Sequence, residues 1–312
     1  MAKNVSFKCQ VCHEEFDTEK GLHIHLKKHK LDLATYYTTY YPRYNKLTGD
    51  PLPFKKKEHY FNYDFYNRRQ LLKWCKEKPK EEVAEYILQK LKQRIKDKDL
   101  KYAPNHIELI NAKLPDIDTY KNIFGSYGKV CELAGVKPLY KSAIDKSFFE
   151  DDSLFEDLNI LIDTREQKPL VFNKSESLKL DFGDYTVGGK NYNYTYVDRK
   201  AEQDFKGTLS GGFQRFKREL QRVKDFDSYL FIVIESNMSK IYKNNLFGPH
   251  KSSLDFVYHN MRVLTHEFAG HCQFVFTGSR ANSQSIIPKI LTLGKKLWDV
   301  DLQYYIDKNG LE

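Results

Sequence analysis

The feature that most constrains this chain is a pair of cysteines followed by a pair of histidines within its first 30 residues. Two residues separate Cys9 from Cys12, and three separate His25 from His29. Two thiolates on a turn and two imidazoles one helical turn apart can converge tetrahedrally on Zn²⁺. A segment of about 30 residues is too short to fold on an apolar core alone, so the metal would supply its folding energy. The spacing therefore predicts a structural zinc site over residues 1–30.

The same segment resembles the two-Cys two-His zinc-finger family, with Phe16 and Leu22 where a small apolar plug covers the metal. Fingers of that family read bases from helix positions −1, 3 and 6. Here these positions are Thr18, Gly21 and Ile24, and none of them is a good base reader. We expect the finger to contact the DNA backbone or a protein, and a purely structural module is the alternative. The lysines that would face phosphates are Lys20, Lys27, Lys28 and Lys30.

The composition favours a nucleic-acid partner. The formal net charge is +9, the pI is about 9.0, and 22 residues are tyrosines. Cations meet phosphates and aromatic rings stack on bases. A tyrosine-rich core beneath a lysine-rich surface would give the same totals, so composition alone leaves both interpretations open.

The cysteines argue against a secreted disulfide framework, because only the first two are close in sequence. No apolar signal region or membrane-length apolar run is present in the sequence. We expect a soluble intracellular protein, in the cytoplasm or with the nucleoid or nucleus, that does not bind membranes. The five cysteines are Cys9, Cys12, Cys75, Cys131 and Cys272.

The rest of the chain divides into regions that differ in composition and in the periodicity of apolar residues. Residues 31–70 form a connector rich in Tyr and Lys, and residues 71–147 show the apolar periodicity of helices. An acidic linker is expected over residues 148–157. From residue 158 to residue 312, predicted strands alternate with predicted helices, which indicates an α/β domain with a mixed sheet flanked by helices. The predicted strands are 159–162, 194–197, 229–234 and 273–277, and the predicted helices are 213–223, 254–268 and 283–297.

Three carboxylates of the α/β region follow or flank predicted strands. They are Asp163, Asp184 and Asp198. Carboxylates at neighbouring strand ends can converge on a hard cation such as Mg²⁺ or Mn²⁺. Lys200 lies two residues after Asp198, so its side chain points to the same side of the strand. It could orient an attacking water or neutralise developing charge. The alternative is that the acids are structural and pair with Arg165 and Arg199.

An acid, one spacer and a lysine after a strand is the PD-(D/E)XK arrangement. The larger pattern, Asp-x-Arg-Glu, Gly-Asp-Tyr and Asp-Arg-Lys-x3-Asp, resembles the nuclease domain of the XPF family over residues 158–297. The resemblance implies a restriction-endonuclease-like fold and metal-dependent cutting near duplex/single-strand junctions. It implies that Asp163, Asp184 and Asp198 bind the metal and that Lys200 is catalytic. It implies support from Arg165, Glu166, Arg199 and Asp204, and substrate contacts by Gly211, Gly212, Arg215, Lys217 and Arg218.

The chain departs from the family pattern at three points. Asp198 stands where the family has Glu, and Gly212-Phe213 stands where it has Gly-Arg. The sequence ends at Glu312, so we expect no helix-hairpin-helix module after the nuclease domain. We therefore do not transfer the family's substrate preference to this chain.

Three further segments allow more than one interpretation. Residues 103–138, with the phrase Phe124-Gly125-Ser126-Tyr127, resemble a helical repeat attached to homing endonucleases. That resemblance implies a helix-turn-helix-like DNA contact, and a plain helical hairpin capped by glycines is the alternative. The tyrosines between residues 36 and 44 could stack on a nucleic acid or pack inside the protein. His266 and His271 are five residues apart, which rules out the one-face spacing of a metalloprotease helix.

Together these patterns predict a metal-dependent DNA endonuclease, with Zn²⁺ as a structural ion and Mg²⁺ or Mn²⁺ as the catalytic ion. A homing, phage or mobile-element enzyme fits the helical repeat. A structure-specific repair or recombination nuclease is an alternative, as is a catalytically silent DNA-binding protein. The expected partner is duplex or branched DNA, and a homodimer is possible because one active site cuts one strand.

Overall fold

The computed structural model describes residues 6–145, 147–150, 158–247 and 253–310. It divides into two compact units, Met1–Val83 and Ala84–Glu312. The elements of the first unit are β1 (Phe7–Lys8), β2 (Glu15–Phe16), α1 (Glu19–His25), the 3₁₀ turn η1 (Leu26–His29), α2 (Leu33–Tyr40), α3 (Lys57–Asn62) and α4 (Arg68–Glu77). Helix α5 (Lys80–Asp97) crosses the boundary between the units.

The first unit is built around a small hairpin and the helix that follows it. Strands β1 and β2 pair in antiparallel fashion with Phe7 opposite Phe16. Helix α1 begins where the Thr18 hydroxyl accepts a hydrogen bond from the Gly21 N–H, as an N-cap should. The apolar core beneath the hairpin continues past residue 30 into α2 and α3. Its buried members are Cys9, Leu22, Leu26, Tyr36, Tyr37, Leu52 and Tyr60.

The second unit contains a six-stranded mixed sheet in the order β10-β9-β8-β7-β5-β6. Strand β7 pairs antiparallel with both neighbours, and the other pairings are parallel. The antiparallel β7 therefore joins two parallel groups. The strands are β5 (Asn159–Asp163), β6 (Lys174–Leu178), β7 (Tyr185–Val187), β8 (Thr195–Lys200), β9 (Tyr229–Ile234) and β10 (Cys272–Phe276).

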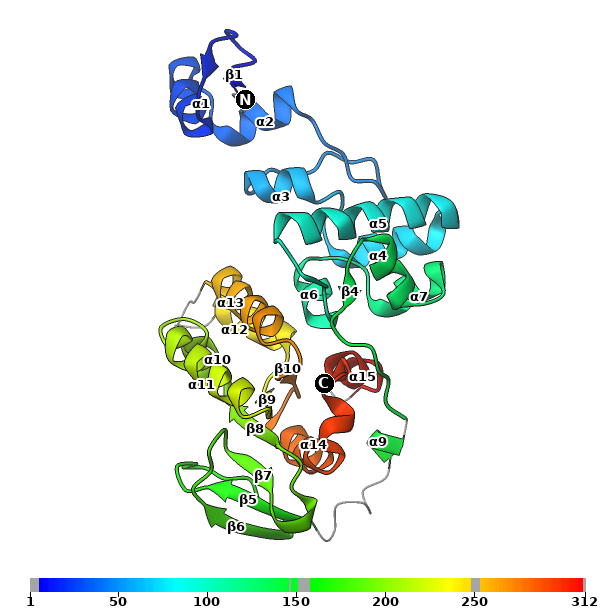
Figure 1. Ribbon diagram of the computed structural model, residues 1–312. Coiled ribbons are helices and arrows are strands. Elements are labelled where there is room, and N and C mark those ends of the chain that lie inside the picture. Colours follow the sequence, from blue (N-terminus) through cyan, green and yellow to red (C-terminus); the bar gives the residue numbers. More distant parts are fainter. Residues whose placement is uncertain (1–5, 146, 151–157, 248–252, 311–312) are drawn as a thin grey trace. The chain divides into compact units, whose positions relative to one another are not determined.

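Helices cover both faces of this sheet (Figure 1). Side chains alternate between faces along a strand, so Leu230, Ile232 and Ile234 of β9 face one core. Tyr229, Phe231 and Val233 face the other. One core includes α10 (Glu202–Thr208), α11 (Phe213–Asp225), α12 (Met238–Phe247) and α13 (Leu254–Glu267). The other includes α14 (Arg280–Leu293), η4 (Gly294–Leu297) and α15 (Leu302–Lys308).

The helical region before the sheet contains β3 (Tyr102–Ala103), α6 (His106–Asn111), α7 (Ile117–Phe124), α8 (Tyr127–Leu133), β4 (Lys137–Pro138) and α9 (Ser147–Glu150). Gly125 ends α7 with φ +87°, a conformation that favours glycine. Ser126 then caps α8 by accepting a hydrogen bond from the Lys129 N–H. The Gly125-Ser126 pair therefore ends one helix and begins the next.

Helix α15 anchors α6 and α7. The Asp301 carboxylate accepts a 2.8 Å hydrogen bond from the His106 N–H, and His106 Nε2 lies 3.0 Å from Asp307 Oδ2. The Tyr304 hydroxyl donates to Asp118 at 2.5 Å. Because Asp301 and His106 are buried, these polar contacts fix the direction of packing as well as contributing stability.

The mixed α/β class predicted from the sequence is confirmed, and each predicted strand overlaps an observed one. Strands β6 and β7 were not predicted, because β6 is exposed along its length and β7 has only three residues. Of the acidic linker expected over 148–157, residues 151–157 lie outside the described residues. No described helix has the length and apolar character needed to cross a bilayer.

We expect Asp301→Ala to lower the free energy of unfolding by about 1–3 kcal/mol, because two backbone N–H groups, those of His106 and Tyr304, lose their acceptor. Denaturant unfolding of the full chain measures this change. The matched control is Glu132→Ala, at an exposed position of α8, which should stay within about 0.5 kcal/mol of wild type. Equal stabilities for the two variants would contradict the anchoring role.

Candidate functional site

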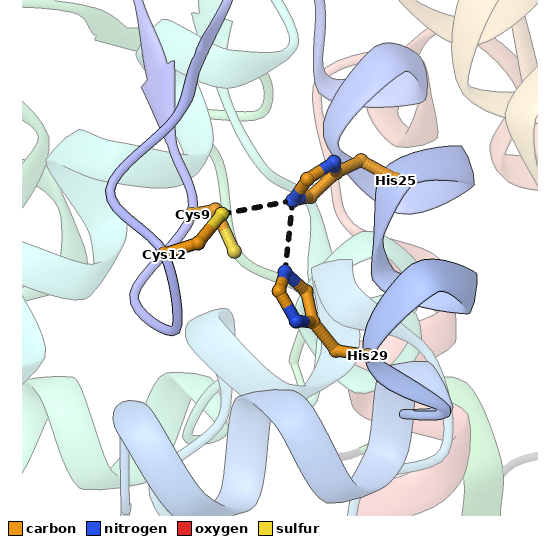
Figure 2. A group of neighbouring side chains, drawn as sticks. All are labelled: Cys9, Cys12, His25 and His29. Atoms are coloured by element: carbon orange, nitrogen blue, oxygen red, sulfur yellow. Dashed lines mark hydrogen bonds between the residues drawn. The ribbon is translucent and has the colours of Figure 1, made fainter.

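The first candidate site is the cysteine and histidine cluster of the first unit. The four ligand atoms of Cys9, Cys12, His25 and His29 lie within 4.8 Å of one another. Figure 2 shows the two cysteines on the hairpin turn and the two histidines on the adjoining helical segment, all pointing toward one centre. His25 Nε2 is 3.1 Å from Cys12 Sγ and 3.0 Å from His29 Nε2. Two sulfur and two nitrogen donors in this arrangement could bind zinc.

Two contacts around the cluster orient His25. Nδ1 of His25 lies 3.5 Å from a carboxylate oxygen of Glu14. An acid near the second ring nitrogen is the usual means of orienting a metal-bound imidazole. The Phe16 ring also packs on His25, with 4.8 Å between ring centroids. The plug residue predicted from the sequence therefore lies against a ligand.

The outer face of the finger has no obvious base-reading group. Ile24 is 58% exposed, and the lysines 20, 27, 28 and 30 are all exposed. The neighbouring tyrosines of α2 face inward, since Tyr36 and Tyr37 are buried against the finger. These two therefore pack inside the unit, whereas Tyr40, Tyr41 and Tyr44 remain exposed.

The second candidate site depends on a close pass of the chain at Gly183. Its φ of +58° is left-handed, and a Cβ there would lie 2.7 Å from the Val197 carbonyl oxygen. Only glycine fits this position without a backbone shift. The next residue, Asp184, donates its N–H to the same Val197 oxygen at 2.7 Å. This pairing brings Asp184 beside the end of β8, where Asp198 and Lys200 are.

Asp184, Asp198 and Lys200 line one cleft of ≈ 870 Å³. Lys200 Nζ lies 3.0 Å from Oδ1 and 2.8 Å from Oδ2 of Asp198. One oxygen of Asp184 accepts the Arg199 N–H at 2.7 Å. The remaining cleft-lining residues are Arg165, Glu166, Gln167, Lys168, Arg199, Ala201, Asp204, Glu235 and Arg280.

The cleft perturbs the titration of its charged groups. Burial, together with the nearby Asp198 carboxylate, holds the pKa of Asp184 well above its ordinary value. Burial opposes the charged form of Lys200, but the carboxylates of Asp198 and Asp184 outweigh it and raise the pKa of Lys200. Ionisation of Asp184 is therefore unfavourable in the cleft, and a bound cation would favour its charged form.

Asp163 has a different environment from the other two acids. It is buried, and Arg165 Nε and Nη2 donate to its two oxygens at 2.7 and 2.9 Å. The backbone N–H groups of Arg165 and Leu180 also donate to it, each at 2.7 Å. Burial raises the pKa of Asp163, but these donors outweigh it and lower that pKa. Both oxygens of Asp163 are thus already engaged by protein donors.

Among the described residues, the Cys/His cluster is the one group of three or more potential ligands whose ligand atoms meet so closely. Asp163, Asp184 and Asp198 are not brought together in that way. Two carboxylates remain at the cleft, and Mg²⁺ is commonly bound by one or two carboxylates with waters and substrate phosphates.

An arginine network holds the loop that forms one wall of the cleft. Arg199 pairs with Glu166 at 3.1 Å and with Glu235 at 2.8 Å. Arg280 lies 3.4 Å from Glu235, and both arginines donate to the carbonyl oxygen of Lys168. Glu166 and Arg199 were candidates from the sequence. Glu235 and Arg280 were not, since neither belongs to a motif.

The remaining candidates lie around the cleft or on α11. Asp204 is exposed in the first turn of α10. Arg215 and Arg218 of α11 are exposed, whereas Lys217 pairs with Glu267 at 2.8 Å. Gly211 and Gly212 lie in the turn before α11. Glu219 of the same helix was missed by sequence reasoning; burial, with Asp198 nearby, raises its pKa.

His266 and His271, whose spacing in the sequence rules out a metalloprotease helix, do not share a helix. His266 is in the last turn of α13, where burial lowers its pKa to about 4. Gly270, with φ +83°, intervenes before His271, whose Nδ1 lies 3.1 Å from the Ser228 carbonyl oxygen. They do not form a shared metal site within the described part of the chain.

No family model matches this chain, and no curated protein matches it. Among solved structures, XPF from Aeropyrum pernix matches with a TM-score of 0.34 and 18% identity, over 43% of this chain and 59% of that one. The same XPF in complex with DNA matches with a TM-score of 0.31 and 17% identity, over 49% of this chain and 66% of that one. The matches thus span less than two thirds of each XPF chain and amount to a distant structural similarity.

Cys12→Ser should reduce bound zinc from about one ion per chain to a small fraction of that, because a tetrahedral site loses a thiolate. Hydrogen exchange should then accelerate across the core shared by the hairpin, α2 and α3. Zinc content and exchange mass spectrometry measure both effects. Cys75→Ser, outside the cluster, is the control and should retain the metal. Full zinc content in Cys12→Ser would refute the ligand set.

Asp184→Asn should stabilise the protein when no divalent metal is added. A carboxyl whose folded-state pKa is raised favours folding at low pH, and stability falls as pH rises from about 4 through the raised value. The variant should therefore exceed wild type by on the order of 1 kcal/mol at pH 8 and by less at pH 5. Denaturant unfolding at both pH values tests this, with the exposed Asp225→Asn as control. A gap that does not grow with pH would contradict it.

Proposed function

We propose that this chain is a metal-dependent endonuclease that hydrolyses phosphodiester bonds in DNA. One observation carries the proposal: Asp184, Asp198 and Lys200 meet in one cleft, and the Lys200 amine lies within hydrogen-bond distance of both oxygens of Asp198. Carboxylates that can hold a divalent cation, with a lysine beside them, suit metal-assisted hydrolysis of a phosphodiester bond. The basic charge of +9 suits a polyanionic substrate.

Asp184 and Asp198 would hold Mg²⁺ or Mn²⁺, because carboxylate oxygens are the ligands these cations prefer. When bound, such a cation lowers the pKa of a water molecule and neutralises charge on the phosphate. We assign Asp163 a positioning role in place of the ligand role expected from the sequence. Its carboxylate holds Arg165 and the Leu180 backbone, and so shapes the turn after β5.

Lys200 would donate a hydrogen bond to the attacking water or to a non-bridging phosphate oxygen, where negative charge develops. Asp198 orients the amine of Lys200 from β8. Glu166 and Arg199 keep the adjoining loop in place, and Asp204 adds a carboxylate to the cleft lining.

Other parts of the chain would position the DNA. In this proposal residues 1–30 act as a zinc finger, residues 31–70 as a connector, residues 71–147 as a helical DNA-contact region and residues 158–312 as the nuclease domain. The exposed cations Lys27, Lys28, Arg215 and Arg218 would contact phosphates, joined by Lys217. A homing, phage or mobile-element role accords with the homing-type repeat, and a repair nuclease is the alternative.

One cleft per chain cuts one strand at a time. A double-strand cut would therefore need a second copy of the chain or two successive events. Cleavage assays at several protein concentrations distinguish these routes, since only the first depends on association.

Lys200→Ala should reduce Mg²⁺-dependent DNA cleavage by about 100-fold or more, because the transition state loses a preorganised cation. The control is Lys240→Ala, which removes an exposed lysine of α12 and should cleave as wild type does. Linear duplex, single-stranded and forked DNA should all be assayed, with the cut sites mapped.

Unchanged cleavage by Lys200→Ala would refute the site assignment. Absence of cleavage by wild type on every DNA form, with DNA binding retained, would favour the catalytically silent DNA-binding alternative. Cuts at fixed sequences in a linear duplex would favour the homing role, and cuts that follow branch structure would favour the repair role.

A further inference from the structure

A row of aromatic rings lies beside the cleft-forming segment of the second unit. We call it the aromatic strip, and its members in spatial order are Phe226, Phe182, Tyr196, Tyr192 and Tyr194. Successive ring centroids are 5.8, 5.3, 6.2 and 4.8 Å apart. Phe182 and Tyr196 are buried, but Phe226 is 64% exposed and Tyr194 is 46% exposed. The strip is thus anchored in the core and open to solvent at both ends.

The exposed tyrosines are held firmly. The Tyr192 hydroxyl lies 2.7 Å from that of Tyr196. Asn193, between the two exposed rings, donates its side-chain amide to the Leu291 carbonyl at 2.7 Å. The Tyr194 carbonyl accepts the Tyr229 N–H at 2.9 Å. The strip therefore presents its rings on a framework joined to β9 and α14.

Tyr194 has an unfavourable backbone conformation. Its φ is +62°, and a bulky residue in the left-handed region costs roughly 1–3 kcal/mol. Strain of this kind persists when the surroundings impose it, and it is concentrated at binding sites. Packing of the ring alone does not offset the free-energy cost of this backbone conformation, because almost half of the Tyr194 side chain faces solvent.

Cations accompany the rings along the strip. The Arg222 guanidinium lies 5.3 Å from the Phe182 ring centroid. Lys295 Nζ lies 5.0 Å from the Tyr194 centroid, and Lys190 is exposed in the turn before Tyr192. Aromatic rings with interspersed cations suit single-stranded nucleic acid, whose bases stack while its phosphates meet the charges.

We propose that the exposed rings of the aromatic strip, those of Phe226, Tyr192 and Tyr194, bind the bases of an unpaired nucleic-acid strand by stacking. This inference rests on the proposed nuclease function and adds a binding site outside the cleft.

The strip is connected to the cleft through the backbone. Phe182 is two residues before Asp184, so the Cα atoms of these residues lie within about 7 Å of each other. Gly183, between them, is fixed by its close approach to Val197. The segment that carries Phe182 therefore continues directly into the cleft.

The test measures binding without cleavage. A fluorescent oligothymidylate and a blunt duplex of equal length are titrated with the full chain, with no added Mg²⁺. Tyr194→Asn removes the ring but retains a residue that tolerates positive φ. Together with Phe226→Ala, it should weaken single-strand binding by about 10-fold or more, since base stacking on a ring contributes about 1–3 kcal/mol. Tyr194→Phe retains the ring and should bind as wild type does.

Tyr242→Ala is the matched control, because this tyrosine is 59% exposed on α12 and lies outside the strip. A single 2-aminopurine in the strand should also lose fluorescence on binding to wild type but not to the double variant. Equal single-strand affinity of the double variant and Tyr242→Ala would overturn the proposal. So would an equal loss of duplex binding, or failure of wild type to bind the single strand. Because cleavage is not measured, loss of nuclease activity elsewhere cannot produce these results.

Discussion

The close approach of Gly183 to the Val197 carbonyl sets how β7 meets its neighbours in the sheet of the second unit. Strand β7 has only three residues, yet it joins the parallel pair β5 and β6 to the parallel group β8, β9 and β10. The chain can enter β7 this tightly only because residue 183 lacks a side chain. The hydrogen bonds from Asp184 N–H to Val197 and from Asp163 N–H to Asp184 then fix the three strands that carry the cleft. The same close approach therefore positions β7 in the sheet and places Asp184 beside Asp198.

Strands and helices with strong patterns could be predicted from the sequence. The apolar run of β9 is buried throughout, as expected of a central strand, and α11 shows the one-sided apolar pattern that sequence reasoning detects. Strand β6 could not be predicted, because its exposed, polar residues are placed by pairing with β5 alone. The pairing with β5 that holds β6 in place produces no pattern of apolar residues in the β6 sequence.

The candidate site was predictable in part for a similar reason. Asp198 and Lys200 lie beside the predicted strand 194–197, so their meeting follows from the local pattern, whereas Asp184 precedes β7, which was not predicted. Glu235 and Arg280 come from the ends of β9 and α14, and nothing in their immediate sequence indicates that they share a carbonyl and a salt bridge with Arg199. The position of Asp163 was foreseen, but saturation of its oxygens by Arg165 and Leu180 depends on three-dimensional contacts. No local sequence pattern indicates these contacts.

The contact between α6 and α15 has a consequence for the order in which the protein is made. His106 and Asp301 are 195 residues apart in sequence. At roughly 5–20 residues per second, a ribosome needs on the order of 10–40 s to travel between them. During that time the helical region lacks its buried acceptor, although every strand of the large sheet has already been synthesised before α15. Helix α15 therefore closes the helical region onto a sheet whose strands have all been synthesised by then.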